Sequence, residues 1–239
     1  MKDRYLPAAV WTFPDVIALF FAGLVGSIIA LAIGQFANGG DELSGVPLLA
    51  ASSLGQAAAQ LGMLAYMSRM RGTASWDLDF GLRFRPSDWL GLLYGMGLQI
   101  AVILLVQLPI AELLDLEDPP VQDVAEIADD AASWLARIAI VVVVVILAPL
   151  TEELLYRGML LSRLRRGLSP HVSVAIAAAV FAGIHLVDPD TAFIVPGLFV
   201  IGLVLGYQAL YTGRIGLAIM THAGVNLLAA VALLADIDV

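Results

Sequence analysis

The chain has 239 residues, of which 60% are hydrophobic and 14% charged, and its formal net charge is −9. A soluble domain is roughly half apolar and about a quarter charged, so this composition indicates an integral membrane protein. The acidic balance argues against a nucleic-acid partner. The absence of cysteine excludes disulfides, iron–sulfur clusters, thiolate zinc sites and a cysteine nucleophile.

A transmembrane helix needs about 20 mostly apolar residues. Seven stretches qualify, at approximately residues 14–36, 46–67, 88–109, 134–162, 171–187, 191–212 and 215–235. The first lacks a small-residue cleavage site after a brief apolar core, so we expect a retained span rather than a cleaved signal peptide. The fourth is too long for one straight span and contains Pro149, where we expect a kink or a break. The sequence therefore predicts an all-α, polytopic membrane helical bundle of about seven to eight transmembrane helices.

The placement of charge predicts the orientation. With a cytoplasmic N-terminus and alternating crossings, the inner side receives ten of the twelve basic residues: Lys2, Arg4, Arg69, Arg71, Arg83, Arg85, Arg163, Arg165, Arg166 and Arg214. Acidic residues gather on the outer side: Asp41, Glu42, the run Glu112 to Asp130, Asp188, Asp190, Asp236 and Asp238. Cytoplasmic loops are enriched in Lys and Arg. We therefore expect a multi-pass protein of the cell (cytoplasmic) membrane with its N-terminus inside and its C-terminus outside.

Residues 1–133 have the character of a scaffold, with three spans and an acidic outer loop. The first two spans are rich in Gly and Ala, which favours close helix packing. The segment Trp76 to Trp89 interleaves aromatic residues with Arg83 and Arg85, a pattern typical of an interfacial belt in contact with membrane lipids. We interpret the run Glu112 to Asp130 as a solvated loop; a metal-binding role for its carboxylates is the lesser alternative.

The most unusual stretch is Ala148 to Gly158, which reads A-P-L-T-E-E-L-L-Y-R-G directly after a strongly apolar run. Ionisable residues at membrane depth are costly and mark functional sites by default. If a helix starts at Pro149, Glu153 and Arg157 lie four residues apart on one face, in the favourable acid-before-base order. Glu152 points about 100° away. This predicts one carboxylate neutralised by Arg157 and one available for chemistry; the alternative is a helix start at the membrane boundary.

Three further polar residues interrupt later apolar spans. His185 follows Phe181 by four residues, and His222 precedes Asn226 by four, so each pair shares a helix face. A lone intramembrane histidine is often only a packed residue, but two histidines, an amide and a carboxylate pair favour one common site. The third histidine, His171, begins a span beside basic residues, and we interpret it as interfacial and non-catalytic.

Membrane depth sets a condition on this convergence. Counting about 1.5 Å per residue from the expected boundaries puts His185 deeper than Glu152, His222 and Asn226. Tilt of the helices must absorb a mismatch of about one turn if the four residues are to meet.

Taken in order, Glu152-Glu153-x-x-x-Arg157, Phe181-x-x-x-His185 and His222-x-x-x-Asn226 resemble the three motifs of the CAAX-protease and bacteriocin-processing (CPBP, or Abi) family of intramembrane endopeptidases. That family includes the Rce1-type prenyl proteases. The resemblance covers about residues 147–228 and makes residues 134–239 a CPBP-like catalytic core.

The resemblance implies a peptidase in which Glu152 and His185 activate a water. His222 and Asn226 would then form the oxyanion-stabilising or metal-binding side, with Glu153, Arg157 and Phe181 in support. Amide hydrolysis needs such a base and such donors. Glu152, His185 and His222 are also candidate ligands for one divalent metal such as zinc, so a metal-dependent and a metal-free reaction both remain open.

The implied substrate is a membrane-associated or lipidated, CAAX-like protein or peptide, whose identity the sequence leaves open. The alternatives are a non-enzymatic membrane scaffold or immunity protein, and a proton-coupled transporter that uses Glu152 and the histidines as a relay. A transporter would be expected to show internal duplication. The polar groups are instead confined to the second half of the chain, which favours the enzyme.

Overall fold

The computed structural model describes residues 7, 9–115, 133–187 and 189–234, and the regular structure within them is entirely helical, without strands. The α-helices are α1 (Phe13–Ala37), α2 (Gly45–Arg71), α3 (Trp76–Phe80), α4 (Leu90–Val102), α5 (Leu108–Leu113), α7 (Trp134–Val141), α8 (Ala148–Glu153), α9 (Ser162–Leu164), α10 (Pro170–Gly183), α11 (Val195–Thr212) and α12 (Gly216–Leu234). Short 3₁₀ segments are η1 (Pro86–Trp89), η5 (Ile184–Val187) and η6 (Pro189–Ile194). Segments of π-helix are η2 (Ile103–Gln107), η3 (Val142–Leu147) and η4 (Leu154–Leu161). The predicted all-α polytopic bundle is confirmed.

The seven apolar stretches correspond to helical runs of the structure. Five runs are long and apolar enough to cross a membrane: Phe13–Ala37, Gly45–Arg71, Pro86–Leu113, Trp134–Leu164 and Ala192–Thr212. Two shorter apolar helices, Pro170–Leu186 and Gly216–Val231, account for the other two stretches. The expectation that a helix starts at Pro149 is wrong, because helix runs without a break from Trp134 to Leu164. The π-helical segments η3 and η4 on either side of α8 absorb the change of backbone register, so the run adds no eighth crossing.

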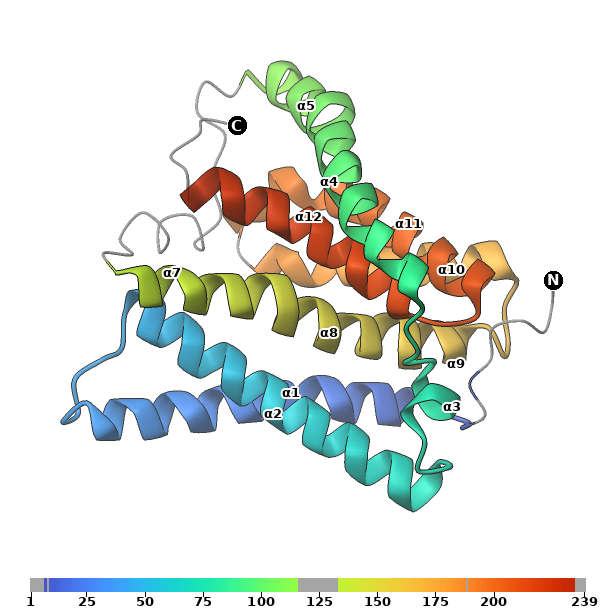
Figure 1. Ribbon diagram of the computed structural model, residues 1–239, viewed down its shortest axis with the longest axis horizontal. Helices are drawn as coiled ribbons and strands as arrows, with labels where there is room; N and C mark the ends of the chain where they lie inside the picture. Colours follow the sequence, from blue (N-terminus) through green and yellow to red (C-terminus); the bar gives the residue numbers. More distant parts are fainter. Residues whose placement is uncertain (1–6, 8, 116–132, 188, 235–239) are drawn as a thin grey trace.

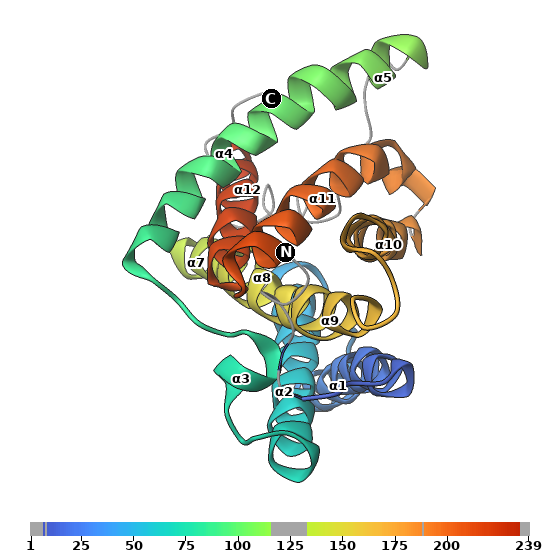
Figure 2. The same ribbon diagram turned by 90° about the vertical axis from the view of Figure 1, so that its right-hand side faces the viewer.

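The run from α7 to α9 forms the centre of the bundle. Figure 2 shows α1 and α2 on one side of it and α10, α11 and α12 on the other, while α4 and α5 lean outward over α12. Every residue of η4 is buried, and apolar side chains from α1, α2, α10, α11 and α12 pack around that segment in one core cluster. The helix that carries the Glu-Glu-x-x-x-Arg motif is therefore enclosed by the others.

The basic helix ends gather at one end of the molecule, on the right in Figure 1. Specific contacts hold this end together. Arg71 at the end of α2 pairs with Asp15 at the start of α1, and Arg214 pairs with the buried Asp88 of η1. Arg166 donates to the carbonyl oxygens of residues 7 and 9, at 3.0 and 3.2 Å. Successive helices that cross a membrane in alternating directions would bring these basic ends to the same side.

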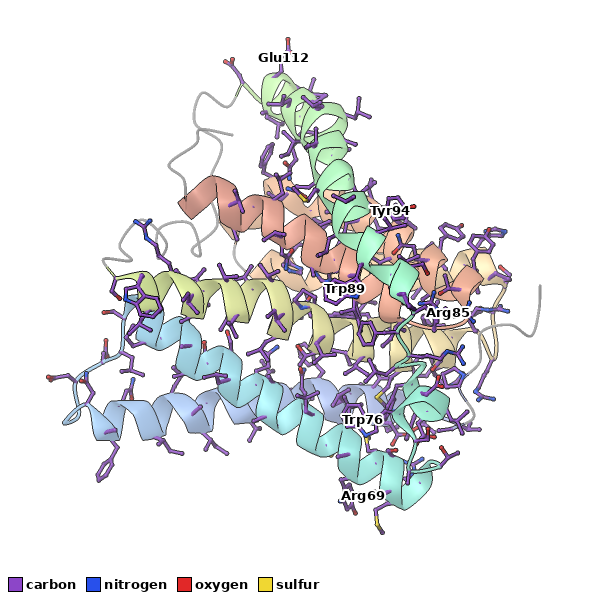
Figure 3. The ribbon with its side chains drawn as sticks, in the orientation of Figure 1. Arg69, Trp76, Arg85, Trp89, Tyr94 and Glu112 are labelled. Carbon is purple, nitrogen blue, oxygen red and sulfur yellow. The ribbon has the colours of Figure 1, made fainter. Side chains whose placement is uncertain are left out.

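Figure 3 shows Arg69, Trp76 and Arg85 toward the basic end, whereas Glu112 lies at the far tip of α5. Several predicted charges lie outside the described residues: Lys2, Arg4, Asp188, Asp236, Asp238 and the part of the Glu112 to Asp130 run from residue 116 onward. The division into a scaffold at 1–133 and a core at 134–239 stays a prediction.

Candidate active site

The central helix carries two adjacent carboxylates in different surroundings. Glu153 is fully buried and accepts a hydrogen bond from the guanidinium of Arg157 at 2.6 Å, with side-chain exposures of 0% and 1%. A second guanidinium nitrogen of Arg157 donates to the carbonyl oxygen of Gly202 in α11, at 3.1 Å. The Glu152 side chain retains 25% exposure. The pair expected from the four-residue spacing is thus present, and Glu152 is the more accessible of the two acids.

His222 connects α12 to both carboxylates. Its Nδ1 lies 2.9 Å from Glu153 Oε1, and its Nε2 lies 3.8 Å from Glu152 Oε2. A carboxylate only accepts hydrogen bonds, so Nδ1 carries a proton in this arrangement. Nε2 is then the His222 atom that faces the more exposed acid. Because the His222 side chain is only 6% exposed, Glu153 fixes the orientation of its ring within the bundle.

Phe181 of α10 contacts both histidines. Its ring makes edge contacts with His185 and His222, at centroid separations of 5.5 and 5.7 Å. The Arg157 guanidinium lies over the same ring, 4.8 Å from its centre, which is a favourable cation–π geometry. His185 itself belongs to η5, just beyond the end of α10, and its Nδ1 lies 2.9 Å from the Phe181 carbonyl oxygen. Nδ1 therefore donates to that carbonyl oxygen.

Asn226 lies one helical turn beyond His222 and is half-buried. Its Nδ2 donates to the backbone carbonyl oxygen of Val144, at 2.8 Å. Val144 belongs to the π-helical segment η3, immediately before the motif helix. Two contacts, His222 with Glu153 and Asn226 with Val144, thus hold α12 against the central helix.

The structure connects six of the seven candidate residues. Glu152, Glu153, Arg157 and His222 form a continuous polar cluster, Phe181 adjoins it, and His185 contacts the Phe181 ring. Asn226, one turn beyond His222, bonds Val144 instead. Residues 133–228 match the family model described as type II CAAX prenyl endopeptidase Rce1-like, and this range includes all seven. The match supports a relationship of this segment to the intramembrane proteases of the CPBP, or Abi, family. No curated protein and no solved structure matches the chain.

The match, like the three motifs, supports a CAAX-type intramembrane endopeptidase in general terms. The family match and the long apolar helices together indicate an integral membrane protein with protease activity. The family match begins one residue before α7, so it covers the central helix, α10, α11 and most of α12, but neither α4 nor α5 (Figure 2).

The donor set of the Rce1-like site does not fit a three-ligand metal centre in this structure. Within the described ranges, no group of three His, Asp or Glu side chains is arranged to hold a metal ion. The Nδ1 bonds of His222 and His185 do not decide the question, because a metal-binding histidine commonly donates its second ring nitrogen to a carboxylate or a carbonyl oxygen.

Three contributors to the Rce1-like site were not predicted from the sequence. Tyr156 is buried and makes an edge contact with Phe181 at 5.3 Å, and Gly202 and Val144 contribute only backbone carbonyls. Tyr156 follows the carboxylate pair within the motif and was available as a signal. The backbone carbonyl groups of Gly202 and Val144 could not be predicted, because every residue has a carbonyl group and the sequence does not show which one accepts a hydrogen bond from another helix. His171 is exposed at the start of α10 and bonds the Tyr207 hydroxyl at 2.8 Å, outside the cluster.

Proposed function

We propose that the protein is a membrane-embedded endopeptidase that hydrolyses a peptide bond in a lipidated or membrane-associated protein, with Glu152 as the general base. The observation that supports this is the contrast between the two acids. Glu153 is sealed and neutralised by Arg157, whereas Glu152 is partly exposed and lies 3.8 Å from His222 Nε2. A base must reach water, and only Glu152 combines access with a neighbouring imidazole.

In the proposed reaction, Glu152 accepts a proton from a water while the water oxygen attacks the scissile carbonyl carbon. His185 helps to orient that water. The carbonyl oxygen becomes an oxyanion, and the remaining N–H of Asn226 and a proton on His222 Nε2 stabilise it. Glu152 then passes its proton to the leaving amine as the C–N bond breaks. Glu153 and Arg157 act by positioning His222, and Phe181 packs against both imidazoles.

Replacement of the proposed base tests this function. Glu152→Gln is nearly isosteric and should reduce cleavage by at least about 10²- to 10⁴-fold, the range that general-base removal produces. The assay uses purified protein in liposomes with a quenched fluorescent peptide that ends in a farnesylated CAAX sequence. A parallel comparison of protein termini in cells expressing each variant covers substrates that are not prenylated.

Glu112→Gln is the matched control, because Glu112 lies at the tip of α5, far from the site (Figure 3). It should cleave like the wild type. Unaltered cleavage by Glu152→Gln in both assays, with the fold retained, would refute the proposal.

The orientation is a second proposal: the basic end faces the cytoplasm, and the belt from Trp76 to Trp89 contacts membrane lipids there. Support comes from the arginine-bearing helix ends that meet on one side of the bundle. The chain has no cysteine, so single introduced cysteines report cleanly. In intact cells, Glu42→Cys should react with a membrane-impermeant thiol reagent and Ser87→Cys should not. The reverse pattern would invert the orientation.

A further inference from the structure

Pro149 interrupts the hydrogen bonding of the central helix immediately before the carboxylate pair. In the π-helical segment η3, hydrogen bonds span five residues, and the N–H of Ala148 bonds the carbonyl oxygen of Val143. The next bond in this spacing would run from residue 149 to the carbonyl oxygen of Val144. Residue 149 is a buried proline, which has no N–H to donate.

Asn226 takes the bond that Pro149 leaves unmade. Its Nδ2 donates to Val144 at 2.8 Å, across the interface between α12 and the central helix. A primary amide nitrogen carries two hydrogens, so this bond still leaves one N–H for a substrate oxygen. The same bond restricts rotation of the amide group. Pre-organised donors of this kind are what an oxyanion site requires.

We infer that Pro149 is a positioning residue for Asn226. By withholding a backbone donor, it keeps the Val144 carbonyl available to the amide, and the amide is held in one orientation toward the cluster. A residue with an N–H at position 149 would compete for the same carbonyl and release the side chain. The consequence for catalysis rests on the proposed function, whereas the hydrogen-bond coupling does not.

The chain supplies its own control. Pro109 lies in the same backbone context, because it follows the π-helical segment η2, whose last bond runs from Leu108 N–H to Ile103 O. Pro109 is on the α4–α5 arm, away from the cluster (Figures 1 and 2). Pro109→Ala therefore reproduces the general effect of replacing a proline after a π-helical segment, without access to Asn226.

The first measurement is the thermal midpoint of unfolding in nanodiscs for wild type, Pro149→Ala, Asn226→Ala and the double variant. Asn226→Ala should lower the midpoint by about 2–4 °C in the wild-type background, the shift expected for one hydrogen bond in a chain of this size. In the Pro149→Ala background it should have almost no effect, because the backbone N–H has already taken the carbonyl. The Pro109→Ala background should preserve the full effect. Additive shifts in the Pro149→Ala background would overturn the inference.

The second measurement is turnover of the farnesylated CAAX peptide. Pro149→Ala should lower kcat roughly tenfold with little change in KM, the loss expected for one weakened positioning hydrogen bond. The α-hydroxy analogue of alanine at position 149, introduced with a suppressor tRNA, has no N–H and should restore both folding and kcat. Equal impairment by alanine and its hydroxy analogue would show that the ring matters and not the missing donor, and would overturn the inference. Coupling in the thermal cycle without turnover in any variant would refute the proposed function and leave the inference standing.

Discussion

Removal of the charge on Arg157 is the strongest stability test that the site offers. Arg157 and Glu153 are a buried pair at 2.6 Å, with side-chain exposures of 1% and 0%. Arg157→Met keeps most of the volume but leaves the Glu153 carboxylate in the apolar interior with His222 as its remaining described partner. It also takes a donor from the carbonyl oxygen of Gly202. Loss of one partner of a buried pair costs about 3–5 kcal/mol.

A series of variants separates charge from geometry. Arg157→Lys keeps the charge but cannot reach Glu153 and Gly202 together as the planar guanidinium does, so it should lose an intermediate amount. The double variant Glu153→Gln/Arg157→Met removes both charges and should be more stable than Arg157→Met alone, because no unpaired charge remains buried.

The assay is reversible unfolding in mixed detergent micelles, with the unfolding free energy compared at one micelle composition. If Arg157→Met costs less than about 1 kcal/mol, which is the range of an exposed ion pair, the cluster is hydrated and the reasoning from burial is refuted. A double variant less stable than Arg157→Met would refute it equally.

Two further predictions have matched controls within the chain. Asp88→Asn should destabilise by about 3–5 kcal/mol, because Asp88 and Arg214 are 2% and 5% exposed. Asp77→Asn breaks a pair in which Arg83 and Asp77 are 46% and 40% exposed and should cost at most about 1 kcal/mol; equal losses for the two variants would contradict this. Gly95→Ala should lower the unfolding midpoint sharply, since its added Cβ would lie 2.6 Å from the backbone nitrogen of Val225 in α12. Gly97→Ala, with nothing within 4 Å, should be neutral or stabilising; similar midpoints would show that α4 and α12 are not closely packed.

The positions of the helices could be predicted from the sequence because hydropathy and length suffice for membrane spans. Apolar windows found all seven helical runs, with ends that differ from the structure by a few residues. The exception was the fourth run, where Pro149 was taken as a helix start. The helix continues because π-helical bonding before the proline and the Thr151 hydroxyl, which donates to the carbonyl oxygens of Leu147 and Ala148, satisfy backbone groups locally.

The contents of the site were more predictable than its internal contacts. Charge at membrane depth and four-residue spacing pointed to all seven residues and to the pairing of Glu153 with Arg157. The bond from His222 to Glu153 depends on how α12 is rotated about its axis and on how closely it approaches the central helix. A single sequence does not specify either of these. The same holds for Asn226 and Val144, where the acceptor is a backbone atom.

The depth mismatch expected for His185 has a structural counterpart. α10 ends at Gly183, and His185 lies in the 3₁₀ segment that follows, where its imidazole bonds the Phe181 carbonyl. Because α10 ends two residues before His185, regular α-helical rise does not extend to this residue, and its depth in a membrane stays a prediction.

The contacts in the site explain how charged side chains can be stable inside an apolar bundle. They form a chain that runs from Arg157 through Glu153 and His222 to Glu152. Arg157 and Glu153 neutralise each other at the buried end of this chain of contacts, where the side chains are least exposed. His222 contacts both Glu153 and Glu152, and the Glu152 side chain is 25% exposed. Glu152 is the most exposed member of the four, and it is the one that solvent reaches. Because desolvation is most costly for an unpaired ion, a carboxylate that stays reactive must occupy this open end. The same ordering therefore serves both stability and the proposed choice of Glu152 as the base.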